Sequence, residues 1–511
     1  MLHRLSCVAV LASVLAVLGC NAGPNNGPAP SSASPSAPAS SPPSSSSSSG
    51  SSSSGTSSSS GTSGSASSGS GSSSSGTSGG TSPPASAGDP AFYKVPPVTG
   101  ATNVIPVTPA QNLQSVYKNA KPGDVLELAA GTYSTGSLDF SISGTASSWI
   151  VVRGAAGTRP VIDLTSSGEL HIGASYFMLE NVSVVNGSGN NIHIIPSTTT
   201  VPTTNVILSD VSSTNMAAGT GAALKIAGNW NNGTGVATDY VYILGCELAG
   251  SRDNALCDAV AVRHAVMRGC YLHDPVVISM SSPGAFFKGG SNEILMENNL
   301  FCRIRGNAAV MLGGDTGAQW FDPLYSNPKI ESVDEVVRNN FLADFDDAAF
   351  EVRGAQNAKI YNNTVVTQTS FAIYRFSWGG NGSGTQIGNH AIAISDDLVL
   401  ATSTPRTAEN DGNSDLTVTF GPALWGGTFG GTYGPALPTI PAAGSVQVPV
   451  SGFPKVLANP TYLSLTGVSD ALARYALVSA SPARGAGAAD GVPYDASGAT
   501  RPATPSLGAL E

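Results

Sequence analysis

The stretch Met296-Glu297-Asn298-Asn299 decides the fold, because its pattern returns as Val337-Arg338-Asn339-Asn340 and Ile360-Tyr361-Asn362-Asn363. Four earlier segments follow the pattern more loosely, with the turn residue at Asn181, Asp210, Cys246 and Cys270. Short intervals, such as that from 340 to 363, match one coil of a parallel β-helix, and long intervals match a coil with an inserted loop such as 313–331. The repeat therefore predicts an all-β solenoid.

Asparagine suits the turn of such a coil for a physical reason. It tolerates the left-handed backbone of a tight turn. Because neighbouring strands lie about 4.8 Å apart, its amide can also bond to the same residue one coil away and form a ladder. Cys246 and Cys270 fall in the same row, which predicts either a stacked pair or a disulfide.

Length and composition agree with a solenoid. Residues 90–511 exceed the usual size of one globular core, whereas a solenoid grows coil by coil without that limit. The chain has 60 glycines and only 11% charged residues. Its net charge of −10 excludes nucleic acid as an expected partner, and disfavours an anionic polysaccharide unless a local basic patch or a bound cation reverses the field.

The N-terminal part predicts export and lipid anchoring. Residues 1–19 form a signal peptide whose apolar run is too short to span a membrane. The run ends in Gly19-Cys20, which resembles a bacterial lipobox and implies lipidation of Cys20. Residues 20–89 are a tether rich in Ser and Gly, unable to bury a core. We expect a lipid-anchored protein of the cell envelope, exposed to the outside; Asn21 is compatible with outer-membrane sorting.

Four cysteines remain after the signal peptide and the lipidated residue are set aside. An even number in an oxidising compartment permits disulfides, and four cysteines allow three connectivities. They are Cys246, Cys257, Cys270 and Cys302.

The two ends of the solenoid also carry signals. Thr108-Pro109, followed by Leu113, Val116, Tyr117 and Ala120, predicts a short helix with a capping residue and a proline at its first position. Such a helix would cover the exposed edge of the first coil. At the other end, an irregular C-terminal segment is expected to close the stack.

The opening Gly123-Asp124-Val125-Leu126-Glu127-Leu128 and the closing Leu507-Gly508-Ala509-Leu510-Glu511 resemble segments of the pectate-lyase-type superfamily. The resemblance covers roughly residues 100 to 511. It implies one right-handed parallel β-helix and action on extracellular polysaccharide.

Phe287-Lys288-Gly289 leads into Asn298-Asn299 and resembles the Lys-Ser strand of chondroitinase B and related alginate lyases. That resemblance implies Lys288 as the base that removes a proton next to a uronate carboxylate. Two features of those enzymes are missing: 311–315 holds no arginine, and Gly284-Ala285 stands where calcium ligands are expected. Alignment with Val352-Arg353-Gly354 and a one-residue bulge predicts that Lys288 points outward beside Arg353, because burying an unpaired ammonium is costly.

A column of alternating charge is predicted four residues after the turn, from Asp274, Arg303 and Asp344. It is either a self-neutralising surface ladder or a cleft wall adjoined by His273 and Arg305. On the second interpretation Arg303 and Arg305 join Lys288 as catalytic residues. His273, Asp274, Arg353 and the loop aromatic Trp320 then bind substrate.

The densest acidic cluster comprises Asp344, Asp346 and Asp347 and is the candidate Ca²⁺ site. Asp346-Asp347 also resembles the paired aspartates of polygalacturonase-type hydrolases, but the Gly-His-Gly and Arg-Ile-Lys segments of those enzymes are missing. Hydrolysis therefore ranks below elimination. Two hypotheses remain open: a polysaccharide lyase, and a non-catalytic glycan-binding protein or adhesin. In either case we expect a monomer that meets the membrane through its lipid only.

Overall fold

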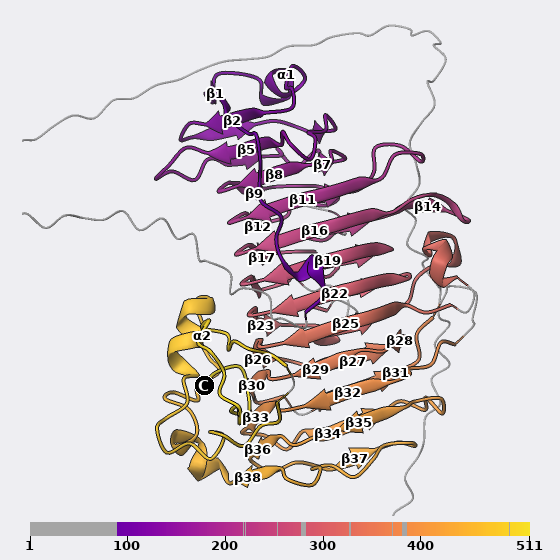
Figure 1. The fold of residues 1–511 in the computed structure, drawn as a ribbon, viewed down its shortest axis with the longest axis vertical. Helices are drawn as coiled ribbons and strands as arrows, with labels where there is room; N and C mark the ends of the chain where they lie inside the picture. The colour runs from indigo at the N-terminus through magenta and orange to yellow at the C-terminus, as the bar shows by residue number, and fades with distance from the viewer. Residues whose placement is uncertain are drawn as a thin grey trace, which may run out of the picture. The chain divides into compact units, whose positions relative to one another are not determined.

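The computed structural model describes residues 89–511, except 218, 220, 253, 277–282, 327–328, 370, 381–385 and 490. The predicted signal peptide, the lipidated Cys20 and the tether lie outside the described residues, apart from Asp89. Three long parallel sheets, named A, B and C here, form one β-helix (Figure 1).

Sheet A opens each coil and contains the strand that precedes the asparagine turn. In sheet order its strands are β1 (Asn103–Val107), β2 (Asp124–Leu128), β5 (Ile150–Gly154), β8 (Phe177–Glu180), β11 (Thr203–Ser209), β16 (Thr238–Leu244), β19 (Val262–Arg268), β22 (Ser291–Glu297), β25 (Ser332–Arg338), β29 (Lys359–Tyr361), β32 (Ile392–Ser395) and β35 (Val418–Phe420), with β28 (Ala355–Gln356) also paired to β25.

Sheet B follows the asparagine turn. Its strands are β3 (Thr132–Ser134), β6 (Val161–Asp163), β9 (Ser183–Val185), β12 (Ser212–Thr214), β17 (Glu247–Ala249), β20 (Tyr271–His273), β23 (Leu300–Ile304), β26 (Phe341–Phe345), β30 (Thr364–Thr367), β33 (Leu398–Ala401), β36 (Leu424–Gly426) and β38 (Val446–Val448).

Sheet C closes each coil. Its strands are β4 (Leu138–Phe140), β7 (Leu170–Ile172), β10 (Ile192–Ile194), β13 (Leu224–Ala227), β18 (Cys257–Val260), β21 (Ala285–Lys288), β24 (Ala308–Gly313), β27 (Ala348–Arg353), β31 (Ala372–Ser377), β34 (Arg406–Asn410) and β37 (Thr432–Tyr433). The coils wind in the right-handed sense of nearly all parallel crossovers. Alternate side chains of all three sheets point inward and form one continuous apolar core, so the predicted right-handed parallel β-helix is confirmed.

The turn between sheets A and B contains two neighbouring rows, where the sequence analysis assumed one. Asn181 and Asp210 stand in the row with positive φ, which continues through Gly245, Gly269, Asn298, Asn339 and Asn362. Cys246 and Cys270 stand one residue later, in the inward row that begins with Val182 and Val211. The single row assumed earlier was therefore wrong, because Gly245 and Gly269 take the left-handed position in those coils.

The inward row forms the predicted ladder. The Asn299 amide donates to Asn340 Oδ1 and the Asn340 amide donates to Asn363 Oδ1, both at 3.0 Å. The Asn363 amide donates in turn to Asp397 Oδ1 at 3.1 Å. Cys246 and Cys270 continue this row as buried free thiols, so the stacked pair is observed and the disulfide is not; Cys257 and Cys302 are also free.

A short helix, α1 (Leu113–Tyr117), covers the N-terminal end of the stack as predicted. Leu113 and Tyr117 are buried, and the Tyr117 ring lies 4.5 Å from the Phe140 ring. The predicted cap was wrong. Asn112 caps the helix through the Ser115 amide at 2.8 Å, because Thr108 closes a separate turn with Gln111 before the helix begins. No helix among the described residues is both long and apolar enough to cross a membrane.

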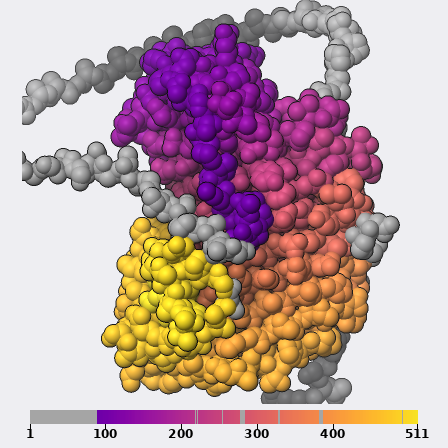
Figure 2. All heavy atoms as spheres, viewed as in Figure 1, coloured from indigo at the N-terminus to yellow at the C-terminus, as the bar shows by residue number. Residues whose placement is uncertain are grey.

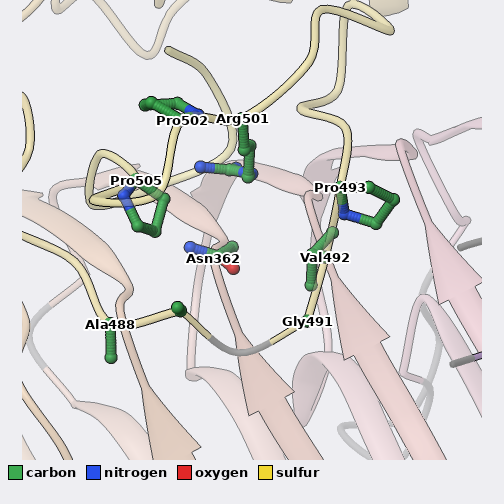
Figure 3. A pocket seen from close by; sticks show the side chains of 9 residues that line it. Asn362, Ala488, Gly491, Val492, Pro493, Arg501, Pro502 and Pro505 are labelled. Atoms are coloured by element: carbon green, nitrogen blue, oxygen red, sulfur yellow. The ribbon is translucent and has the colours of Figure 1, made fainter. Parts of the chain in front are cut away.

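The C-terminal segment lies along the outer face of sheet B rather than only closing the end of the stack (Figure 2). It contains the 3-10 helix η4 (Val450–Lys455) and the helix α2 (Val468–Arg474). Phe453, Leu465 and Tyr475 pack against outward residues of sheet B such as Leu300 and Phe341. Its last residues reach the turn at Asn362 (Figure 3). Apolar residues on the outer face of sheet B explain why the segment packs there.

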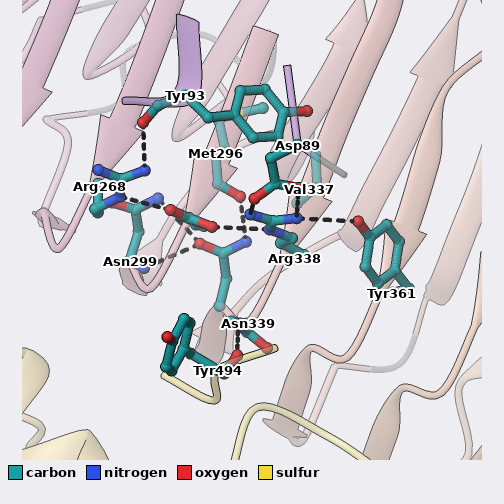
Figure 4. Close-up of polar contacts among 12 residues, drawn as sticks. Asp89, Tyr93, Arg268, Met296, Asn299, Val337, Arg338, Asn339, Tyr361 and Tyr494 are labelled. Atoms are coloured by element: carbon teal, nitrogen blue, oxygen red, sulfur yellow. Dashed lines mark hydrogen bonds and ion pairs between the residues drawn. The ribbon is translucent and has the colours of Figure 1, made fainter. Parts of the chain in front are cut away.

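The first described residues form a strap, residues 89–98, over the outer face of sheet A. It includes the 3-10 helix η1 (Ala91–Tyr93), whose Phe92 and Tyr93 pack against outward residues of this sheet. Beneath it lies a buried ionic cluster: Glu297 accepts from Arg268 Nε at 2.5 Å and from Arg338 Nε at 2.8 Å (Figure 4). Arg338 also pairs with Asp89 at 2.9 Å. The cluster therefore joins the strap to three coils.

Candidate functional site

The outer face of sheet C carries one column of side chains in register through all eleven strands. Strand pairing aligns Asp139, His171, His193, Lys225, Asp258, Phe286, Met311, Glu351, Arg375, Glu409 and Tyr433. We call this set the sheet C column. Ten of the eleven are ionisable or aromatic, although outward positions of a solenoid need no such chemistry. The column is therefore the candidate site.

At its centre, two lysines flank one buried carboxylate. The side chain of Asp258 is 5% exposed; it forms a short ion pair with Lys225, and Lys288 Nζ lies 3.8 Å from its Oδ1. These two lysines lower the pKa of Asp258 against the opposing effect of burial. One carboxylate between two ammonium groups leaves a local excess of positive charge in a chain of net charge −10.

Lys288 lies at the outer end of β21, and its outward orientation was predicted correctly. Phe287 aligns with Leu312 and Leu312 with Val352, so Lys288 and Arg353 occupy one column with Gly313 between them. The additional residue lies in the Gly289-Gly290 turn, where the sequence analysis placed a bulge in a strand. Lys288 Nζ is 4.0 Å from the centre of the Phe286 ring, within cation–π range.

The turn that holds Lys288 is anchored by a fully buried carboxyl group. Glu331 accepts from the Gly289 amide at 2.8 Å and from the Thr316 amide at 2.9 Å. Burial raises the pKa of Glu331 to about 7, against the opposing effect of these hydrogen bonds. Gly314 packs against the Lys288 chain so closely that a Cβ there would lie 2.9 Å from Lys288 Cδ. The base candidate is thus held on two sides.

Toward the C-terminal end, three carboxyl groups surround Arg375. Asp347 pairs with Arg375 at 2.9 Å. Burial, and then the nearby Glu351 and Glu409, raise the pKa of Asp347 to about 6 although Arg375 opposes the shift. Burial also raises the pKa of Glu351. This end of the column can hold a proton at mildly acidic pH.

Toward the N-terminal end, the column carries two histidines beside carboxylates. His193 Nδ1 lies 3.3 Å from Glu169 Oε1, and His171 Nδ1 lies 3.1 Å from Asp139 Oδ1. Burial lowers the pKa of His193 and so favours its neutral form. Burial raises the pKa of Glu169, but hydrogen bonds with His193 and Asn190 bring it down to about 2.

The predicted site residues divide between two sheets. Lys288, Arg353 and Asp347 lie at sheet C, and Arg353 pairs with Asp315 at 2.5 Å. Trp320 belongs to the 3-10 helix η2 (Ala318–Trp320) and packs, partly buried, against an apolar cluster that includes Val260, the strand neighbour of Lys288. The structure brings these side chains to one side of the β-helix.

The other predicted residues lie in or beside sheet B, so they do not join Lys288. Arg303 bonds to Asp274 at 2.8 Å and to the Leu465 carbonyl at 2.9 Å, which fastens the C-terminal segment to sheet B. His273 stacks on Tyr271 with ring centres 3.8 Å apart. The predicted column of Asp274, Arg303 and Asp344 is present: the three residues follow aligned positions in successive coils, and each has a positive φ. Within the column only Arg303 and Asp274 pair, whereas Asp344 pairs with Arg305 from outside it.

The three aspartates of the candidate Ca²⁺ site do not converge. Arg305 binds Asp344 at 2.9 Å and Asp346 at 2.7 Å, whereas Asp347 turns toward Arg375 on sheet C. Among the described residues, no group of three or more His, Cys, Asp or Glu side chains is arranged to hold a metal ion. These residues therefore do not fit the predicted ion.

Lys225, Asp258 and His193 belong to the column but were missed in the sequence. Each is the single polar residue between two apolar ones, as in Leu224-Lys225-Ile226, Cys257-Asp258-Ala259 and Ile192-His193-Ile194. That short alternation was the available signal, since it predicts an outward position on a strand.

No protein-family model matches the sequence, and no curated protein is significantly similar to it. Several solved structures are similar to the chain. The chain is similar to pectate lyase Pel9A, with 14% identity over 81% of this chain and 97% of that one, and a TM-score of 0.38. It is also similar to the A-module of mannuronan C-5 epimerase AlgE4 of Azotobacter vinelandii, with 12% identity over 66% and 91% of the two chains and a TM-score of 0.42. The adhesin PfbA of Streptococcus pneumoniae matches at 10% identity over 64% and 76%, with a TM-score of 0.36.

Proposed function

We propose that this protein binds a uronate-containing extracellular polysaccharide along the outer face of sheet C. The observation that carries the proposal is the sheet C column, with Lys225 and Asp258 at its centre and Lys288 next to Asp258. A polymer laid along the solenoid axis meets one position of the column every 4.8 Å or so, the spacing of the strands. The two lysines supply the local positive charge that a uronate carboxylate requires.

Replacing either central lysine is expected to weaken binding. With the purified full chain and a panel of uronate and neutral polysaccharides, Lys225→Ala and Lys288→Ala should each lower affinity about tenfold, the loss of roughly 1.4 kcal/mol of charge-assisted contact. Lys359→Ala, an exposed lysine on sheet A, is the matched control and should leave affinity unchanged. Equal affinity in all three variants would contradict a glycan on sheet C.

Elimination at Lys288 is the second candidate, favoured by the outward Lys288, which shares the Asp258 carboxylate with Lys225. In its uncharged amine form, Lys288 Nζ would take the proton from C5 of the uronate while the C4–C5 double bond forms. The bond from C4 to the glycosidic oxygen breaks, and that oxygen takes a proton from solvent. Lys225 would lie near the carboxylate and stabilise the negative charge that develops there.

The ultraviolet absorbance of the new double bond tests this reaction. We expect a signal from the full chain that Lys288→Ala abolishes and Lys359→Ala retains. If the protein binds glycan but produces no absorbance with any substrate, the lyase reaction is refuted and the binding function still stands. Reducing ends released without absorbance would instead indicate hydrolysis at the carboxyl groups around Asp347.

The anchoring is proposed from the sequence. Lipidation of Cys20 and a tether reaching residue 89 would hold the β-helix outside the cell and clear of the membrane. Cys20→Ser should move the protein from the membrane fraction to the medium or periplasm and remove labelling by a fatty-acid analogue. Membrane retention of Cys20→Ser would refute the lipid anchor.

A further inference from the structure

A pocket of about 210 Å³ lies where the last residues of the C-terminal segment meet the turn at Asn362. Figure 3 shows Arg501 and Asn362 within a ring made by Val492, Pro493, Pro502 and Pro505. None of its lining residues belongs to sheet C, so the pocket is separate from the sheet C column. Its volume is below the roughly 300 Å³ of sites that hold drug-sized ligands, which limits the occupant to a small group.

Two buried donors line this pocket without a hydrogen-bond partner among the described residues. They are Nε of Arg501, which is 7% exposed, and Nδ2 of Asn362, which is 1% exposed. Leaving a buried donor unpaired costs about 1–3 kcal/mol, so two in one pocket call for an acceptor.

Arg501 is held rigidly, which leaves only Nε available. Its Nη1 donates to Glu511 at 2.7 Å and to the Ser506 carbonyl at 3.2 Å. Its Nη2 donates to Asn339 Oδ1 at 2.9 Å and to the Gly508 carbonyl at 2.8 Å. The guanidinium cannot turn toward another partner without breaking these bonds.

Charge and wall chemistry narrow the class of ligand. Glu511, Asp495 and Asp396 all act electrostatically on Arg501, so the positive charge is already compensated and a further anion is disfavoured. The remaining walls are apolar, from valine and three prolines. An uncharged carbonyl oxygen could accept hydrogen bonds from both donors without adding charge. A methyl group next to it would pack on the prolines, so an acetyl group fits both the donors and the apolar walls.

We propose that this pocket binds the acetyl group of an acetylated sugar, with the carbonyl oxygen on Arg501 Nε and Asn362 Nδ2. This proposal rests on the proposed glycan binding in one respect: the bound polysaccharide would be the source of the acetylated sugar. N-acetyl and O-acetyl groups share this chemistry and are separated by the probes used.

The test is titration of the purified full chain with small sugars, followed by ligand-observed NMR. N-acetylglucosamine and 6-O-acetylglucose report the two sources; glucosamine, glucose and acetate ion lack the neutral acetyl group. At least one acetylated sugar should bind about tenfold or more tightly than its unacetylated parent. The proposal would be overturned if acetate ion were the one probe that binds, or if none of the probes bound.

Two variants locate the site. Asn362→Asp replaces the donor with an acceptor and should weaken acetyl-sugar binding about tenfold. Ala489→Trp, at an exposed lining residue, should block the pocket even if the first variant folds poorly. Asn298→Asp is the matched control, because Asn298 has the same left-handed turn position, with φ of 59° against 55° for Asn362.

If Asn362→Asp and Ala489→Trp both bind acetylated sugars as tightly as the wild type, the acetyl group does not bind in this pocket. The two functions are independently testable: Lys288→Ala should spare the acetyl pocket, and Ala489→Trp should spare binding along sheet C.

Discussion

Glu297→Ala is expected to lower the free energy of unfolding by about 3–5 kcal/mol, the cost of removing one partner from a buried ion pair. The Glu297 side chain is 6% exposed and lies between Arg268 and Arg338, which are equally buried. Without it, Arg268 keeps the Tyr93 carbonyl and Arg338 keeps Asp89, but two positive charges then face each other in a region of low dielectric.

Urea denaturation of the full chain, followed by circular dichroism, measures this loss. Glu127→Ala is the matched control, because Glu127 pairs with Arg153 on the same sheet with side chains 31% and 38% exposed. That exposed pair should contribute no more than about 1 kcal/mol. Equal losses in the two variants would show that burial does not determine the strength of the Glu297 cluster.

Glu335→Gln is expected to stabilise the protein at neutral pH. Glu335 points into the solenoid in line with Ile294 and is fully buried. Burial raises its pKa to about 8, only partly offset by Ser332 and the Gly313 backbone. In the unfolded chain the same carboxyl ionises near its ordinary pKa of about 4.3. Holding it protonated at pH 7 therefore costs about 3 kcal/mol.

The pH dependence follows from this raised pKa. The protonated carboxyl is stabilised in the folded chain, so its contribution is fully present below about pH 4.3 and is lost as the pH rises through the folded value of about 8. The advantage of Glu335→Gln over wild type should grow between pH 5 and pH 8, as read from urea midpoints. Glu335→Leu removes the same charge and should show the same trend. A constant difference across this range would contradict a protonated Glu335.

The turn between sheets A and B shows how far local sequence reasoning reached. Left-handed turn residues and an amide ladder were both predicted, because each is a property of one short segment. Assigning Asn181 and Cys246 to one row was wrong, since a left-handed turn accepts either asparagine or glycine and the sequence alone did not show which residue took it. Pairing of β8, β11 and β16 settled the alignment.

The candidate site was less accessible to such reasoning. Lys288 was placed outward from its likeness to Arg353 in strand shape. Arg303 was grouped with it on the interpretation that the charged column forms a cleft wall, yet Arg303 lies in the neighbouring sheet B. Lys225 and Asp258 are 33 positions apart and become neighbours only when β13 pairs with β18.

The sequence by itself determined the coil: short alternating strands, left-handed turns and inward amides are set by the backbone preferences and polarity of a few consecutive residues. Only the tertiary structure decided which side chains share a column on sheet C and which outer faces are covered. Loops of different length separate the coils, so distance along the chain does not predict which outward residues meet. The position of the C-terminal segment could not be predicted from the sequence either, because the segment packs on an apolar surface of sheet B that many coils build together.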